Sequence, residues 1–264
     1  MTPEYKKALV SLLYNLADDN FILAYRGSEW LGLAPHIEED VAFSSINQDM
    51  MGHAVMYYSL LETLGEGPID ELAHRREATA FKNASVLELK NGKGDYLHEP
   101  KFDWAFTVVR SLFFSTYKKE RLQALRRSNY EPLAQAAAKI LTEHSYHLMH
   151  WETWFVQLMT STVEARRRME AALIKVWACF GDVLSYGAEK KSISANGLLL
   201  HEEELSKRWL KRIHSLFEKV SYTPDGHPGF SSGHGRMGAH TEDLGQALAT
   251  LSEVYQSDPL ATGW

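Results

Sequence analysis

The sequence predicts an all-α protein built on an antiparallel four-helix bundle, and two observations lead to this prediction. The first is helix length, because apolar residues recur at helical spacing across residues 36–64. A helix of about 29 residues would be roughly 43 Å long, which suits a bundle better than a globin-like packing. The second is a pair of similar histidine-bearing segments, residues 48–53 and 143–147, which fall in two such helices.

Helices are predicted wherever apolar residues recur three and four positions apart and turn residues bound the run. Pro3 suits the first turn of the first helix, and a Gly- and Pro-containing turn at 65–68 ends the second. Long helices are expected at 3–26, 36–64, 102–127, 133–159, 163–186 and 202–220, and shorter ones at 69–83 and 241–255.

Two stretches are predicted to be non-helical. Residues 84–101 contain a loosely alternating run, a turn at Asn91 and Gly92, and a closing Pro100, so a hairpin or an extended loop would fit. Residues 223–235 are rich in Gly and Pro without an apolar period, which predicts a mobile loop. We therefore expect one domain, residues 1–264, with a four-helix core, extra helices and a C-terminal helix.

Composition narrows the functional classes. A chain of 264 residues, 45% of them hydrophobic, is typical of one soluble globular domain. Its net charge of −6 argues against nucleic-acid binding and polybasic membrane binding. No apolar run reaches the ~18 residues of a membrane span, and the N-terminal residues do not resemble a signal peptide. The cytoplasm is the expected location.

Cys179 is the single cysteine, which excludes an intrachain disulfide and any Cys-rich metal site. Its apolar neighbours predict an inert buried thiol rather than a nucleophile. The chain also has no Gly-x-Ser-x-Gly elbow and no Gly-rich loop that joins a strand to a helix. A nucleophilic triad and a nucleotide-binding loop therefore have no support.

The two histidine segments carry part of the ligand pattern of a carboxylate-bridged di-iron bundle. In such a bundle two helices each contribute Glu-x-x-His, because a three-residue step points both side chains at one metal pair. His53 and His147 occupy the histidine positions, but Met50 and His144 stand where glutamates are needed. The first helix carries Asn20 at the same depth. The sequence therefore predicts a degenerate di-iron site that holds no metal.

Neighbouring acidic residues do not restore this site. Asp49 and Glu143 are one residue away from the ligand positions, so their side chains point about 100° from the required direction. In the first helix, Asp18, Asp19 and Asn20 interrupt the apolar stripe. These three residues are either a solvated face or the relic of a site.

The alternative to a degenerate di-iron site is a site for a single metal ion. His53, His144 and His147, with His150 as a further candidate, could supply three imidazoles to zinc. The other interpretation is that these are core histidines whose hydrogen bonds are satisfied within the protein. A separate run of three arginines, residues 166–168, is either a solvated helix face or a patch for phosphate or an acidic partner.

Short motifs in a fixed order make the chain resemble a known family, the C-type components of the bacterial phenylacetyl-CoA 1,2-epoxidase. The resemblance extends over nearly the whole length. A specific example is Gly-Ala-His-Thr-Glu-Asp-Leu-Gly at residues 238–245. The other matching segments lie at residues 19–20, 27–35, 39–42, 47–52, 91–92 and 143–147.

The resemblance implies a ferritin-like fold and a non-catalytic structural role in aerobic phenylacetate degradation. In that family a catalytic subunit of similar fold carries the di-iron site and binds the acyl-CoA, and the subunit resembled here is its partner with the ligand positions replaced. The implied partners are the catalytic subunit, in a heterodimer and a higher assembly, and the other epoxidase subunits. The protein itself would need no cofactor.

Two other functions stay open at this point. The chain could be a stand-alone metal-binding oxidase or hydrolase that uses the cluster of His53, His144 and His147. It could also be a self-associating module that holds an acyl-CoA directly, with the arginines at 166–168 contacting phosphates.

Overall fold

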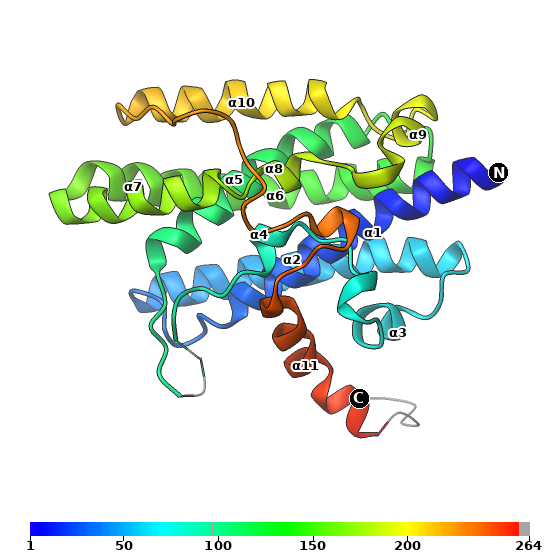
Figure 1. Ribbon diagram of the computed structural model, residues 1–264, viewed down its shortest axis with the longest axis horizontal. Helices are drawn as coiled ribbons and strands as arrows, with labels where there is room; N and C mark the ends of the chain where they lie inside the picture. The colour runs from blue at the N-terminus through cyan, green and yellow to red at the C-terminus, as the bar shows by residue number, and fades with distance from the viewer. Residues whose placement is uncertain (95, 97, 259–264) are drawn as a thin grey trace.

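Figure 1 shows the computed structural model, which describes residues 1–94, 96 and 98–258. Within these ranges the chain is all-α, with no strand and two isolated β-bridges. Four long helices form the core, with α1 packed on α2, α5 on α6, and α2 on α6. They are α1 (Pro3–Ser28), α2 (Ile37–Thr63), α5 (Trp104–Leu125) and α6 (Glu131–Ser161). The prediction of an all-α four-helix core is confirmed.

Further helices cover this bundle. In Figure 1, α7 and α10 run along the long axis of the view on the α5–α6 side, and α11 leaves the opposite side. Both α7 and α10 pack against α5. The longer of these helices are α7 (Val163–Trp177), α10 (Glu202–Lys219) and α11 (Glu242–Ser257), and the short ones are α3 (Ile69–His74), α4 (Ser85–Glu88), α8 (Gly181–Leu184) and α9 (Lys190–Ala195).

Side-chain caps explain where several helices begin. Asp103 accepts a hydrogen bond of 3.1 Å from the backbone N–H of Phe106 at the start of α5. Thr162 accepts one of 3.1 Å from Ala165 at the start of α7. Such caps satisfy backbone donors that have no partner inside the helix. The long helices therefore begin within a few residues of the predicted positions.

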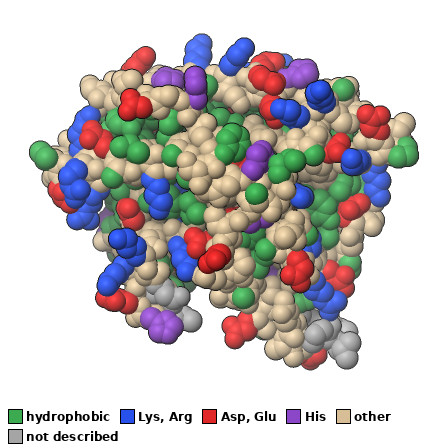
Figure 2. All heavy atoms as spheres, viewed as in Figure 1, with side chains coloured by type: hydrophobic (Ala, Val, Ile, Leu, Met, Phe, Trp, Pro, Cys, Tyr) green, Lys and Arg blue, Asp and Glu red, His purple; other side chains and the backbone are tan. Residues whose placement is uncertain are grey.

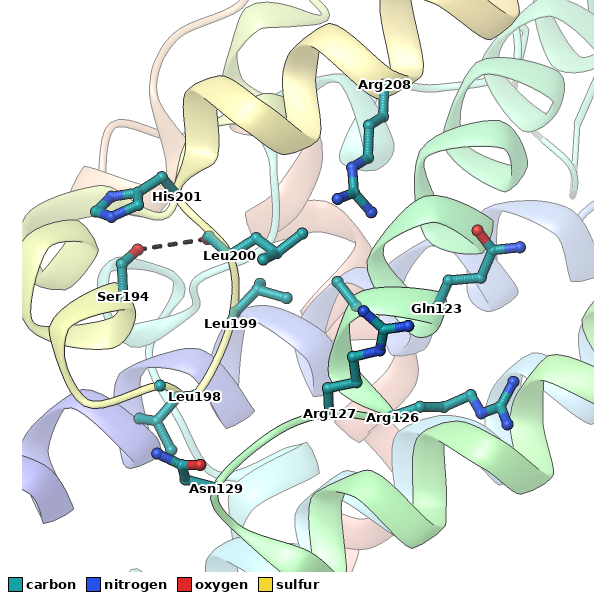
Figure 3. Close-up of a pocket in the computed structure, with 12 residues that line it drawn as sticks. Gln123, Arg126, Arg127, Asn129, Ser194, Leu198, Leu199, Leu200, His201 and Arg208 are labelled. Atoms are coloured by element: carbon teal, nitrogen blue, oxygen red, sulfur yellow. Dashed lines mark hydrogen bonds between the residues drawn. The ribbon is translucent and has the colours of Figure 1, made fainter.

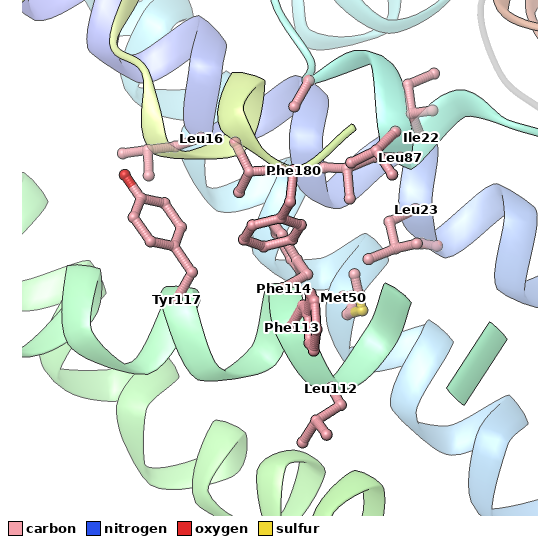
Figure 4. Packing of buried hydrophobic residues seen from close by; sticks show 14 of the residues in the cluster. Leu16, Ile22, Leu23, Met50, Leu87, Leu112, Phe113, Phe114, Tyr117 and Phe180 are labelled. Atoms are coloured by element: carbon pink, nitrogen blue, oxygen red, sulfur yellow. The ribbon is translucent and has the colours of Figure 1, made fainter. Parts of the chain in front are cut away.

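The core lies where α1, α2 and α5 meet the short elements that cross them. Figure 4 shows Leu16, Ile22 and Leu23 of α1 facing Phe114 of α5 and Phe180, which follows α7. All of these side chains are buried. Cys179 is buried at the edge of the same region, as predicted for a thiol among apolar neighbours.

The predicted helix at 69–83 is wrong beyond His74. After α3 the chain forms a 3₁₀ turn at Ala78–Ala80, and two later backbone donors bind buried carboxylates of α1. Lys82 N–H donates to Asp18 Oδ2 at 2.7 Å, and Ala84 N–H donates to Asp19 Oδ1 at 3.0 Å. Because these partners come from a distant segment, the local pattern of apolar residues could not reveal the break.

The predicted helix at 163–186 also ends early, at Trp177. There the chain turns to receive the segment that precedes α11. Gly181 N–H donates to Gly229 O at 2.7 Å, and Gly229 N–H donates to Trp177 O at 3.0 Å. A Cβ at Gly181 would lie 2.8 Å from Gly229 O, so this close approach requires glycine. The prediction that 84–101 is non-helical is wrong at its start, where Ser85–Glu88 forms the short helix α4; Gly92 of this stretch makes an isolated bridge with Phe102.

The segment 223–235 follows α10 and joins the core in its second half. Gly235 N–H donates to Asp182 Oδ2 at 2.7 Å, and the Ser232 and Ser85 hydroxyls are 2.7 Å apart. Arg236, which comes next, is buried and bonds both carboxylate oxygens of Asp19 at 2.8 Å. The predicted mobility stays a prediction for the residues before Gly229.

Asp18 and Asp19 are fully buried, so they do not form a solvated face. Asp18 bonds Arg76 and the Tyr58 hydroxyl, and Asp19 bonds Arg121 at 3.0 Å as well as Arg236. Buried carboxylates require such partners, because an unpaired buried charge is strongly destabilising. These contacts tie α5 and the segment before α11 to α1.

The surface carries charges of both signs. Figure 2 shows acidic and basic side chains interspersed over the face in view. The arginines at 166–168 are paired: Glu164 accepts from Arg167 and Arg168 at 2.7–2.8 Å, and Glu170 accepts from Arg166 at 2.8 Å. Across the described residues, none of the helices is both long and apolar enough for a membrane span.

Candidate functional site

The predicted ligand positions come together in the middle of the four-helix core. Asn20 of α1, Met50 and His53 of α2, and His144 and His147 of α6 are all buried. The rings of His53 and His147 have centroids 6.1 Å apart, and those of His144 and His147 are 5.7 Å apart. The structure therefore brings together the residues that the di-iron pattern selected.

The fourth helix contributes Lys118, which the sequence analysis missed. Its side chain is 1% exposed, and its Nζ lies 2.9 Å from His53 Nδ1. It also donates a hydrogen bond to Asn20 Oδ1. The ammonium group thus occupies the space between an imidazole nitrogen and the α1 position, which is where a metal would have to bind.

A signal for Lys118 is present in the sequence. It is the one lysine within the buried side of α5, which runs through Ser111, Ser115 and Leu122. A di-iron bundle needs a carboxylate from the helix that faces the first one. Asking which residue of α5 lies at the same depth as Asn20 and His53 would therefore have identified Lys118.

Glu143 and Lys118 determine the tautomer of His53. An ionised carboxylate only accepts hydrogen bonds, so the ring proton is on Nε2, and Nδ1 accepts from Lys118. That Nε2–H donates to Glu143 Oε2 at 2.9 Å. Burial, with a contribution from the charge of Lys118, lowers the pKa of His53. The imidazole is therefore neutral and forms a bridge from the buried ammonium to a half-exposed carboxylate.

The same two helices, α2 and α6, are joined by a second His–carboxylate contact in the opposite direction. His147 of α6 donates its Nε2–H to Asp49 Oδ2 of α2 at 2.8 Å. Each of the two helices thus supplies one histidine and one carboxylate, and each histidine bonds the carboxylate of the other helix. The Asp49 and Glu143 side chains are each 42% exposed, so they approach the histidines from the solvent side of the cluster.

His144 and His150 have separate partners. His144 Nε2–H donates to the carbonyl oxygen of Ser115 at 2.7 Å, and His150 Nε2 lies 3.1 Å from Glu39 Oε1. Burial and the charge of Lys118 lower the pKa of both His144 and His147. The Nδ1 atoms of His144 and His147 are buried without a hydrogen-bond partner among the described residues.

These residues do not fit a di-iron centre. Two iron ions require several carboxylate ligands to balance their charge, whereas this cluster offers an amide, a thioether and neutral imidazoles around a lysine. Two free imidazole nitrogens are also fewer than the three protein ligands of a catalytic zinc site. In the part of the chain that the structure describes, no group of three His, Cys, Asp or Glu could hold a metal ion.

The space beside the cluster is almost filled. It is lined by Met50 and Ser115, together with Trp151 of α6, and its volume is about 10 Å³. Sites for small molecules are typically about 300–1,000 Å³. This space is therefore far too small for a substrate.

The sequence comparisons agree with this architecture. The profile of the family described as phenylacetic acid catabolic protein matches residues 1–264. The chain is 27% identical over 252 residues to the C component of the 1,2-phenylacetyl-CoA epoxidase of Escherichia coli K12, which covers 95% of this chain and 97% of that protein. It is 23% identical over 248 residues to the A component of the same enzyme, which covers 90% of this chain and 76% of that protein. The fold is thus ferritin-like, and the chain belongs to the phenylacetic acid catabolic protein family.

Proposed function

We propose that this protein is the non-catalytic structural subunit of a phenylacetyl-CoA epoxidase, and that it pairs with the di-iron catalytic subunit. Family membership and the similarity to the C component of the Escherichia coli enzyme support a role in phenylacetate catabolism. The observation that carries the finer proposal is Lys118, whose ammonium group lies between Asn20 and His53. The Lys118 amino group fills this point, and in its charged form, below about pH 7, it also repels a metal ion.

The same contacts favour a structural role over a stand-alone metal enzyme. Lys118 bonds both Asn20 and His53, so polar contacts instead of metal ligands join α5 to α1 and to α2. The reciprocal pairs of His53 with Glu143 and His147 with Asp49 join α2 to α6. A bundle held in this way keeps its shape without a metal.

The outer face of α2 and α6 is the surface that we propose for the partner. Large apolar side chains are exposed there, and a hollow of about 430 Å³ runs along the two helices beside Ala42, Met149 and Trp154. Contiguous exposed apolar surface marks protein interaction sites. The exposed apolar residues of this face are Ile37, Val41, Val55, Tyr146 and Met149.

The occupant that we propose is the catalytic subunit, which has the same fold by family membership. Tyr146 and Met149 are 69% and 59% exposed. They follow the half-exposed Glu143 along α6, so a partner on this face would reach the solvent side of the His–carboxylate pairs. Obligate interfaces are large and apolar, and long straight helices provide the required area.

The Met149→Glu variant is expected to weaken binding of the catalytic subunit. A charge placed in an apolar interface loses its water without gaining a partner, so the Kd should rise about thirtyfold or more. The measurement is the Kd between the purified chain and the catalytic subunit from the same organism, by biolayer interferometry. The matched control is Ile174→Glu on α7, where the wild-type side chain is 66% exposed.

Binding of the control should stay within about threefold of wild type. An unchanged Kd for Met149→Glu would remove α2 and α6 from the interface. A catalytic subunit that is stable and fully active on its own would overturn the structural role itself. Size-exclusion chromatography of this chain alone shows whether the same face joins two copies instead.

A further inference from the structure

A second cavity, whose lining includes none of the residues of the histidine cluster, has the chemistry of an anion site. It has a volume of about 650 Å³ and lies between the end of α5, the turn after α9 and the start of α10. Three arginines line it, and none of the residues that the structure places in its lining is Asp or Glu. Its lining residues are Gln123, Ala124, Arg126, Arg127, Asn129, Ser194, Gly197, Leu198, Leu199, Leu200, His201 and Arg208.

Arg126 and Arg127 differ from the other arginines of the chain. Within the described ranges, every other arginine side chain makes an ion pair or a hydrogen bond with the protein, for example Arg212 with Glu152 at 3.4 Å. Arg126 and Arg127 make neither. Both are exposed, and both line the same cavity. Two guanidinium groups without carboxylates are thus left at one place in a protein whose net charge is −6.

The third arginine reaches the cavity from a different helix. Figure 3 shows the guanidinium of Arg208 extending from α10 toward that of Arg127, which rises from the end of α5. Arg208 also pairs with Glu204 one turn before it, where both side chains are about half exposed. That single carboxylate leaves the group of three arginines with an excess of positive charge.

Stabilisation of α5 does not account for this arrangement. Cations near a helix C-terminus interact favourably with the helix dipole, and Arg126 is the C-cap residue of α5. The dipole effect would not require Arg208 of α10 or a cavity, so it does not explain why both are present. Gln123 and Asn129 add amide groups to the lining, and the leucines at 198–200 form its apolar side, with Leu200 only partly buried.

We propose that this cavity binds a small molecule that carries a diphosphate group. Guanidinium groups pair bidentately with phosphate oxygens, and three of them match more than one phosphate charge. The volume of about 650 Å³ exceeds what a single phosphate needs, and the wall of leucines suits an apolar part of the same ligand. This inference does not depend on the pairing proposed above.

The test is a calorimetric titration of the full chain at low ionic strength with inorganic diphosphate, ADP and coenzyme A. Low salt is required because exposed charges are screened. Binding with a Kd below about 1 mM is expected for at least ADP or coenzyme A. Equal affinities would indicate a nucleotide, and a tighter Kd for coenzyme A would indicate a thioester carrier. Both results uphold the diphosphate site.

The decisive variant is Arg126→Gln with Arg127→Gln, which is expected to weaken binding at least about tenfold. Its control is Arg167→Gln with Arg168→Gln, which removes the same charge from exposed arginines that pair with Glu164. The control should stay within about twofold. Equal losses in both variants, or no binding by wild-type protein at about 10 mM probe, would overturn the proposal.

Discussion

Replacing Lys118 with methionine is expected to remove a decrease in the free energy of unfolding that the wild type shows as the pH falls toward 7. Burial, with a contribution from the charge of Arg121, lowers the pKa of Lys118 from 10.5 to about 7. Below pH 7 the side chain is charged in both the folded and the unfolded chain, so the cost of burying the charge is fully present. Above pH 7 the folded chain releases this proton while the unfolded chain keeps it until about pH 10.5.

The free energy of unfolding of the wild type should therefore rise with pH relative to that of the Lys118→Met variant. Linkage gives about 1.4 kcal/mol per pH unit in this window, so the difference should change by about 3 kcal/mol between about pH 7 and pH 9.5. Below about pH 6 the two curves should run parallel. Methionine has a similar length and carries no charge. The quantity to compare is therefore how the difference in unfolding free energy between wild type and variant changes with pH.

Urea unfolding at a series of pH values measures this difference. The control is Lys119→Met, which changes the adjacent, less buried lysine. Its unfolding curve should keep the wild-type dependence on pH. Parallel curves for Lys118→Met and wild type over the whole range would show that burial does not lower the pKa of Lys118.

A fourfold variant is expected to acquire iron that the wild type does not bind. The changes are Asn20→Glu, Met50→Glu, Lys118→Glu and His144→Glu. Together with His53 and His147 they complete the pattern of one glutamate from each of two helices and Glu-x-x-His from each of the other two. Elemental analysis after growth with excess iron should find about two iron ions per chain, against well below one for the wild type.

The matched control is the threefold variant that keeps Lys118. It carries the added carboxylates, but the ammonium group stays between His53 and the α1 position, so its iron content should remain below about half of the fourfold value. Circular dichroism and chromatography confirm that each variant is folded. A folded fourfold variant without iron would show that these positions are not the ligand positions. One or more tightly held ions in the wild type would overturn its non-catalytic role.

The local pattern of the sequence was sufficient for the long helices. Apolar spacing and capping residues are properties of neighbouring positions, so α1, α2, α5, α6 and α10 lie close to their predicted limits. The same pattern was sufficient to select Asn20, Met50, His53, His144 and His147, because a three-residue step on a helix fixes which side chains share a face.

Contacts between distant segments decided the rest. The helix predicted at 69–83 ends at His74, and buried Asp18 and Asp19 take the backbone donors of residues 82 and 84. Lys118 meets Asn20 and His53 only after three helices have packed, and Asp49 and Glu143 bond histidines across a helix pair. By itself the sequence determined an all-α bundle and selected five residues that meet at its centre. Only the tertiary structure placed a buried ammonium group among them, because the environment of a charge depends on the residues that surround it in space.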